Sequence, residues 1–293
     1  MFASFLTTIC FAFSVVFAAR SARLIGGSAA NLGRMIIALL LLGIWAHVFG
    51  QGLAGKSLGW FLLSGVIGFG VGDIALFLAL TRIGPRLTIL LAQCLAAPFG
   101  ALIEWTWLGV TVRAAQLACG AIILIGVAIA LAPQRHLDVH RPAFFLGALF
   151  GVLAALGQAL GAVISRKATF LAHAEGLMID GGTAAYQRVL GGIGVTALFF
   201  LASRRIAPPR AKGNFAAAAP WIGLNALAGP TLGVGCYQWA LAVAPTAVVL
   251  PIVATTPVVA IPLVWLIDGD RPSLRSIIGG VIAVAGSVAL TLV

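Results

Sequence analysis

The sequence predicts an all-α membrane protein whose ten transmembrane helices form two inverted five-helix repeats. Hydrophobic residues occupy 61% of the 293 positions and charged residues only 9%, whereas an ordinary soluble domain carries about 25% charged residues. The apolar residues fall into about ten runs, each near the roughly 20 residues that a helix needs to cross the hydrocarbon core. The two halves of the chain also resemble each other. This composition leaves no room for a soluble domain.

Five apolar runs in the first half are separated by short polar or glycine-rich turns. They cover residues 2–19, 31–49, 58–80, 87–106 and 114–132. The third run is rich in glycine and the fourth contains a central proline, and both residue types are commoner in transmembrane helices than in soluble ones. The N-terminal stretch MFASFLTTIC lacks the basic region of a signal peptide, so we expect the first run to remain as a helix.

Five further runs follow in the second half. They cover residues 143–165, 183–202, 215–240, 245–267 and 275–293. The longest polar stretches are 133–141, 166–182 and 203–214, and none is long enough to fold as a domain. We therefore expect one domain made of two repeats, residues 1–138 and 139–293.

An internal repeat relates the two halves. At an offset of 159 residues, the matched pairs are Gly70 with Gly229, Pro98 with Pro257 and Gly120 with Gly279. Earlier in each half, an offset of 154 aligns Arg34 with Arg188. Because each half contains five helices, an odd number, the second half must cross the membrane upside down. Secondary transporters with such inverted repeats place the substrate site at the repeat interface, near mid-membrane.

Basic residues give the chain a net charge of +11, but they lie in short turns and form no continuous patch. We therefore expect no nucleic-acid partner. Lys and Arg accumulate in the cytoplasmic loops of membrane proteins. Twelve of them lie in the odd-numbered loops and four in the even-numbered loops. This distribution favours odd loops in the cytoplasm and both termini outside.

Two features occur at matching places in both halves. The second helix of each half carries an early arginine, Arg34 or Arg188, and the fourth carries a central proline, Pro98 or Pro257. Two five-helix halves with these features resemble the drug/metabolite transporter superfamily.

The start of the last helix strengthens this resemblance. Residues 268–286 read DGDRPSLRSIIGGVIAVAG, which is similar to the G-E-x-x-(S/T)-x-x-x-x-x-G signature of the EamA-type branch. Asp270 stands where that branch usually has Glu. In the first half Thr111 occupies the equivalent place, so the acidic residue is missing there.

The resemblance covers nearly the whole chain and implies a ten-helix fold that transports small metabolites, amino acids or drugs by alternating access, often outward. The bacterial exporter of aromatic amino acids and methyl viologen is the most similar kind. We therefore expect a multi-pass protein of the bacterial inner membrane. The resemblance also implies that both termini lie in the cytoplasm, whereas the loop charges favour the opposite, so both orientations stay open.

The functional prediction is a secondary transporter, most readily an exporter, of neutral or aromatic amino acids, with hydrophobic cations such as methyl viologen as further cargo. The alternatives are an intramembrane enzyme and a channel-like or scaffold protein. The sequence has no DDxxD, HExxH or Walker A motif and no repeated polar filter. We therefore expect no enzyme activity, no cofactor and no bound metal. The expected partners are the lipid bilayer and a small-molecule substrate, and the expected state is a monomer.

Polar and aromatic side chains inside the apolar runs are the candidates for a substrate cavity, because such groups must find partners or line a wet cavity. A charge at the bilayer centre costs about 3 kcal/mol, which makes Asp73 foremost. It could bind a proton, a cation or a substrate amine, or it could pair with an arginine. The full set is Asp73, Phe77, Gln93, Phe99, Gln158, Asn225, Tyr237, Gln238 and Trp239. Ordinary helix packing is the alternative for each.

The remaining candidates concern gating. Arg34 and Arg188 could contact a substrate carboxylate or lock a gate, or they could extend to the membrane interface. Glu104, near the end of the fourth run, is expected at the interface. Glycine and proline permit helix bending, with static kinks as the alternative. The hinge candidates are Gly70, Gly72, Pro98, Gly229, Pro230, Pro251 and Pro257.

Overall fold

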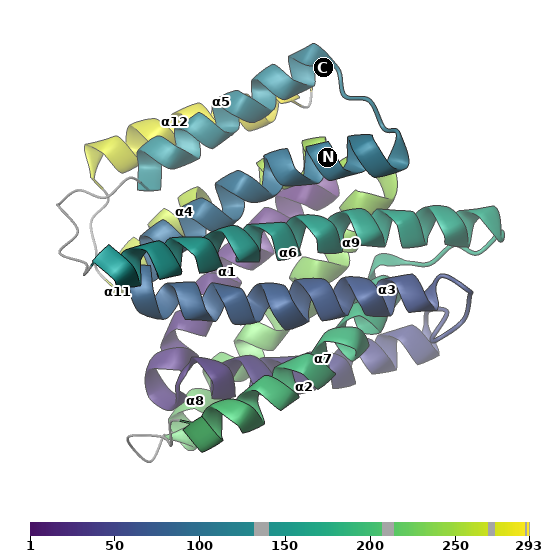
Figure 1. The fold of residues 1–293 in the computed structure, drawn as a ribbon, viewed down its shortest axis with the longest axis horizontal. Coiled ribbons are helices and arrows are strands. Elements are labelled where there is room, and N and C mark those ends of the chain that lie inside the picture. The colour runs from purple at the N-terminus through teal and green to yellow at the C-terminus, as the bar shows by residue number, and fades with distance from the viewer. Residues whose placement is uncertain (132–140, 207–213, 269–272, 291, 293) are drawn as a thin grey trace.

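The computed structural model describes residues 1–131, 141–206, 214–268, 273–290 and 292. Within these ranges the chain forms a bundle of helices and contains no strand (Figure 1), as the sequence predicts. The predicted repeat boundary between residues 138 and 139 lies outside the described residues, and so does Asp270.

The first half of the chain forms five membrane crossings. Its elements are α1 (Phe2–Ile25), α2 (Gly27–Val48), α3 (Leu58–Gly65), the π-helix η1 (Val66–Gly72), α4 (Asp73–Leu108) and α5 (Ala114–Leu131). α1 continues past its predicted end at residue 19. Gly26 then turns the chain into α2 with a φ of 86°, a conformation that glycine adopts without steric cost.

α4 consists of two arms that run in opposite directions. A straight helix of its 36 residues would be about 54 Å long, nearly twice the hydrocarbon thickness. The first arm is antiparallel to α6 (Arg141–Ala174), whereas the second arm is parallel to it. The contacts that show this are Gly147–Ile83 and Gly157–Gly72 before the reversal, and Gly151–Leu91 and Gln158–Gln93 after it. The chain therefore reverses where the sequence predicts the loop between the third and fourth helices.

The second half repeats this pattern. Its elements are α6, α7 (Gly181–Ile206), α8 (Phe215–Ala226), the π-helix η2 (Leu227–Gly233), α9 (Val234–Val243), α10 (Thr246–Val253), α11 (Thr256–Asp268) and α12 (Leu274–Leu290). The predicted polar loop from residue 166 to 182 is wrong at its start, because α6 continues to Ala174. Arg166 is buried inside this helix, where an ion pair with Glu104 compensates its charge.

The ten crossings account for every helix of the described chain. Six stretches are long and apolar enough to span a membrane by themselves: Phe2–Ile25, Gly27–Val48, Leu58–Leu76, Phe144–Ala174, Gly181–Ser203 and Thr246–Leu263. α5 and α12 are shorter apolar helices. The second arm of α4 and the continuous unit α8–η2–α9 supply the other two crossings.

The π-helices η1 and η2 lie at corresponding places in the two halves, in the third and eighth crossings. Their bounds align Gly68 with Gly229 and Gly72 with Gly233, so the offset here is 161 residues and Gly70 is not the counterpart of Gly229. The sequence comparison was wrong by two residues because glycines recur at every second position from 68 to 72. π-helical turns are rare and occur frequently at functional sites.

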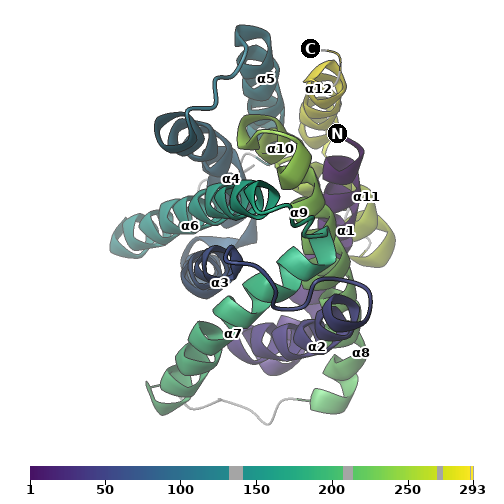
Figure 2. The same cartoon turned by 90° about the vertical axis from the view of Figure 1, so that its right-hand side faces the viewer.

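The helix contacts confirm the inverted relation of the halves. α5 and α12 lie side by side at one edge of the bundle, opposite α2, α7 and α8 (Figure 2). At their crossing, the backbones of Gly126 and Gly279 touch, while Ile123 lies against Gly286. Rising numbers on α5 thus meet falling numbers on α12, so these matching helices are antiparallel.

Candidate functional site

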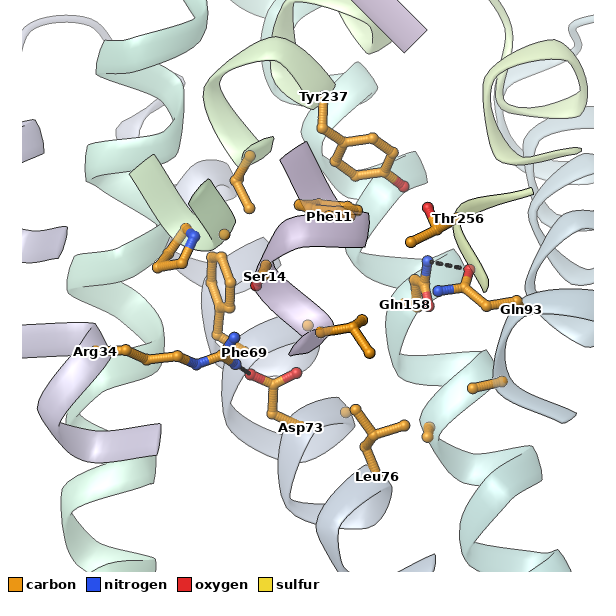
Figure 3. A pocket seen from close by; sticks show the side chains of 18 of the residues that line it. Phe11, Ser14, Arg34, Phe69, Asp73, Leu76, Gln93, Gln158, Tyr237 and Thr256 are labelled. Carbon is orange, nitrogen blue, oxygen red and sulfur yellow. Dashed lines mark hydrogen bonds and ion pairs between the residues drawn. The ribbon is translucent and has the colours of Figure 1, made fainter. Parts of the chain in front are cut away.

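A cavity of about 200 Å³ lies between the two halves. The first helix of each half contributes to its wall, and so do the second, third, fourth, seventh, eighth and ninth crossings, the third and eighth through their π-helices and the segments that follow. The lining residues are Phe11, Ser14, Val15, Arg34, Gly68, Phe69, Gly72, Asp73, Leu76, Ala92, Gln93, Ala154, Gln158, Arg188, Gly229, Pro230, Val234, Tyr237 and Thr256 (Figure 3). This is the repeat interface at which the sequence predicts a substrate site.

Asp73 and Arg34 form an ion pair in the cavity wall. Arg34 Nη2 donates to Asp73 Oδ2 over 2.8 Å, and Arg34 Nε donates to Asn31 Oδ1 over 2.7 Å. The two charged side chains keep 15% and 19% of their surface exposed, so they face the cavity while neutralising each other. Asp73 directly follows η1, and this π-helix therefore positions the carboxylate.

A polar group of different character lies on the opposite wall. Gln158 Nε2 donates to Gln93 Oε1 over 3.3 Å, which joins the second arm of α4 to α6. The Tyr237 hydroxyl points towards Thr256, close to this glutamine pair (Figure 3). These residues offer uncharged donors and acceptors. Phe11 supplies aromatic surface near them, and Phe69 supplies it on the side of the Arg34–Asp73 pair.

Arg188 lies deeper in the wall and is 5% exposed. Its guanidinium carbon lies 5.2 Å from the ring centre of Phe69. A Cβ atom added at Gly68 or Gly161 would come within 2.9 or 3.2 Å of Nη2, so both glycines make space for the side chain. The backbone of Arg188 also touches Gly65 so closely that no side chain would fit there.

The break between α10 and α11 brings Thr256 to the cavity. Pro257 has no N–H, so it cannot bond to the Val253 carbonyl as a continuous helix would require. The hydroxyl of Thr256 donates to that carbonyl over 2.6 Å instead, and Thr255 similarly donates to Ile252. Irregular backbone at membrane depth is tolerated where it is satisfied in this way or lines a cavity. The predicted ninth helix is therefore two helices.

Some predicted cavity residues lie elsewhere. Asp73, Gln93, Gln158 and Tyr237 line the cavity, and so do the gate candidates Arg34 and Arg188. The residues that do not line it are Phe99, Asn225, Gln238 and Trp239. The side chain of Phe77 lies outside the described part of the structure.

Helix geometry explains one of these differences and a buried hydrogen bond explains another. Successive residues turn by about 100° around a helix axis, so Trp239 lies on the far side of the helix from Tyr237. Its indole is 49% exposed and contacts Phe2. Asn225 is buried and accepts a hydrogen bond of 2.7 Å from Ser14, which makes it a link between α1 and α8.

The hinge candidates divide by position. Gly70 and Gly72 belong to η1, and Gly229 and Pro230 belong to η2. Pro251 lies inside α10, and Pro257 follows the first residue of α11. Pro98 lies in the second arm of α4, where its side chain is exposed.

A second buried polar cluster was missed in the sequence. Glu104, expected at the interface, is 1% exposed. It forms an ion pair with Arg166 and accepts hydrogen bonds of 2.6 and 2.5 Å from the backbone N–H and the hydroxyl of Thr246. Arg166 also donates to the carbonyls of Leu241 and Ala244. This Glu104–Arg166–Thr246 cluster joins the two halves away from the cavity.

Asp180 organises the connection that precedes α7. Its Oδ1 atom accepts from Gly182 N, Thr183 N and Trp45 Nε1 over 2.8, 3.0 and 2.8 Å. A carboxylate in this position caps the helix N-terminus. Burial opposes ionisation, but the hydrogen bonds from Thr183, Trp45 and Gly182 outweigh it and lower the pKa of Asp180 below its usual value. The first turn of α7, one turn before Arg188, is thereby fixed.

The chain resembles known proteins both in sequence and in structure. The profile of the EamA-like transporter family matches residues 1–132 and 145–292. A solved crystal structure, described only as that of a protein, is similar over 99% of this chain and 98% of its own, with a TM-score of 0.79 and 17% sequence identity. At that identity it supports the fold alone. No curated protein matches. The profile covers nearly the whole sequence in two copies, and the chain belongs to the EamA-like transporter family.

Proposed function

We propose that this member of a small-molecule transporter family is an alternating-access carrier of neutral or aromatic amino acids in a bacterial inner membrane. The observation that carries the proposal is the cavity between the repeats, which combines an ion pair, a neutral polar wall and aromatic rings. Inverted-repeat carriers hold their substrate at this kind of interface. The cavity volume of about 200 Å³ is below the 300–1,000 Å³ of typical drug sites, which favours a small metabolite.

Alternating access requires that one membrane face be closed while the other is open. The connections between α2 and α3, between α6 and α7, and between α9 and α10 lie on one face, here called the Asp180 face. Contacts across the halves are dense there, because the Glu104–Arg166–Thr246 cluster and the hydrogen bond from Trp45 to Asp180 both cross between them. These contacts support a conformation that is closed at the Asp180 face.

The π-helices and the break before α11 suit the required motion. Each occurs beside the cavity and interrupts regular helical hydrogen bonding. In our proposal the two repeats rock about the cavity, and cargo binding shifts the balance between the two open states. The carrier acts as a monomer, because one chain encloses the whole cavity.

The experiment that tests the proposal is uptake into proteoliposomes containing the purified protein, first without an imposed ion gradient. We expect saturable uptake of a labelled amino acid that excess unlabelled amino acid blocks. A panel of neutral and aromatic amino acids is compared with methyl viologen in the same vesicles. Uptake of methyl viologen alone would replace the amino-acid assignment with a hydrophobic-cation carrier. Uptake of neither, with and without a proton gradient, would contradict the proposal.

A further inference from the structure

The matching arginines of the two repeats, Arg34 and Arg188, have different surroundings. Arg34 has both a carboxylate partner, Asp73, and an amide partner, Asn31. In the second half, the position that corresponds to Asn31 holds Ala185, three residues before Arg188. The position that corresponds to Asp73, directly after the π-helix, holds Val234. The second arginine has therefore lost both of the acceptors that satisfy the first.

Within the described residues, no other group replaces these acceptors. Among the residues that the structure describes, no carboxylate lies within ion-pair distance of Arg188, and its buried Nε atom has no hydrogen-bond partner. Besides the two glycines that make space for it, the guanidinium contacts the Phe69 ring, which accepts no strong hydrogen bond. A guanidinium at membrane depth without an acceptor is costly. Asp73 acts on this charge electrostatically from beyond ion-pair distance, so the guanidinium retains hydrogen-bond donors for an acceptor that enters the cavity.

Tyr237 adds a second unsatisfied group to the same cavity. Its side chain is 4% exposed, and its hydroxyl has no hydrogen-bond partner in the described structure. Both Tyr237 and Arg188 line the cavity, and they are close enough to interact electrostatically. A buried hydroxyl and a buried guanidinium, both lacking an acceptor in the described structure, therefore line the same cavity.

The charge balance of the cavity identifies the class of that acceptor. Arg34 and Asp73 neutralise each other, so Arg188 leaves the described lining with a charge of +1. A single carboxylate matches this charge, and its two oxygens fit a guanidinium in a bidentate geometry that no neutral group reproduces. A phosphate dianion would require a further cation, and the described lining contains no lysine.

We propose that Arg188 and Tyr237 form a subsite that binds the carboxylate of the cargo. The inference rests on the proposed transport function and narrows it, because it requires a carboxylate-bearing metabolite and disfavours hydrophobic cations. Arg34, although related to Arg188 by the repeat, takes no part in this subsite, because Asp73 already occupies its guanidinium. Arg188 is thus a specificity-determining residue.

The test compares matched ligands that differ in one group. Dissociation constants are measured by calorimetry on purified full-length protein for L-phenylalanine, 3-phenylpropionate and 2-phenylethylamine, and for the corresponding series from L-leucine. The wild type is expected to bind the two carboxylate-bearing compounds of a series and to bind the amine at least 10-fold more weakly. Arg188→Gln should weaken carboxylate binding by roughly 10- to 100-fold, since hydrogen bonds to charged groups contribute that much. Tyr237→Phe should weaken it by several-fold.

Arg82→Gln is the matched control variant. Arg82 also lies over a phenylalanine ring, 4.9 Å from the centre of Phe150, and donates to a backbone carbonyl. It does not line the cavity, so its replacement should leave every dissociation constant unchanged. Arg188→Lys keeps the charge but loses the bidentate geometry, and it should bind carboxylates more tightly than Arg188→Gln. If Arg188→Gln only reduced the fraction of folded protein, it would weaken the apparent binding of acids and of amines equally.

Several outcomes would overturn the subsite. They are equal binding of the amine and the acids, unchanged carboxylate binding in Arg188→Gln, and no binding of any carboxylate in the panel. The same ligands are then tested for uptake into proteoliposomes. Arg188-dependent carboxylate binding without uptake would support the subsite and contradict the transport proposal. Uptake of the amine without preference for a carboxylate would support transport and overturn the subsite.

Discussion

Replacing Glu104 alone should destabilise the protein more than replacing Glu104 and Arg166 together. Replacing Glu104 with Leu leaves a guanidinium whose side chain is 6% exposed, with only backbone carbonyls as acceptors, and it removes the acceptor of two Thr246 donors. Breaking a buried ion pair costs about 3–5 kcal/mol. The stranded N–H and hydroxyl of Thr246 should bring this single change to the upper end of that range.

The Arg166→Met change strands only the Glu104 carboxylate, which keeps its two hydrogen bonds from Thr246. Its cost should therefore lie at the lower end, at about 3 kcal/mol. The double variant has no isolated charge, and apolar replacements of buried pairs are often nearly neutral. The two Thr246 donors stay without their acceptor in the double variant, so we expect it to cost less than Glu104→Leu alone, with a coupling energy of about 3 kcal/mol or more.

Unfolding in mixed micelles with increasing SDS would give the free energies of the four proteins in this cycle. Glu175→Gln is the control, because Glu175 is an exposed carboxylate on the same face that accepts a single backbone hydrogen bond from Lys56. Its replacement should change the free energy of unfolding only slightly. Additive effects of the two single changes, or costs below about 1 kcal/mol for both, would refute the reasoning.

Three further variants test other parts of the structure. Asp180→Asn should flatten the pH dependence of stability. Because the pKa of Asp180 is lowered, the wild type has the capping contribution above about pH 4 and loses it as the pH falls through the folded-state pKa. Parallel stability curves for the two proteins would contradict this. Gly65→Ala should push α3 away from α7, because the added Cβ would overlap the Arg188 carbonyl, and the melting temperature should fall by several degrees. Gly59→Ala is the control, because a Cβ there meets open space, and it should leave the melting temperature unchanged. Asp73→Asn should slow uptake and alter its pH profile by freeing its arginine partner, and normal uptake at every pH would exclude a coupling role for Asp73.

The length of the apolar runs and the internal repeat predicted the fold, because both can be read from the sequence without knowing which residues are in contact. The bilayer fixes the length of a crossing, and an odd number of helices per half fixes the inversion. The third and fourth helices were predicted separately, which the reversal of α4 confirms. The end of α6 was predicted wrongly, because the pair Arg166–Lys167 has the composition of a loop. Only a partner 62 positions earlier, Glu104, makes its burial possible.

The candidate site was predictable only in part. Asp73, Gln93, Gln158 and Tyr237 stand out because they are polar groups within apolar runs, and all four line the cavity. Polarity within an apolar run does not distinguish a residue that lines a cavity from one that is hydrogen-bonded to a neighbouring helix. The same criterion therefore also selected Asn225, which accepts a hydrogen bond from Ser14. It could not identify Phe11 or Phe69, because a phenylalanine in an apolar run is compatible with any surroundings.

The replacement of Asp73 and Asn31 by Val234 and Ala185 has a thermodynamic consequence. Matching positions of the two inverted repeats therefore present different chemistry to the cavity, so the two open states should bind cargo with different affinities. This difference cannot by itself drive net transport, since the affinities and the conformational equilibrium form a closed cycle whose free energies sum to zero. Unequal apparent affinities at the two faces should therefore coexist with equal cargo concentrations at equilibrium, unless a second ion moves with the cargo.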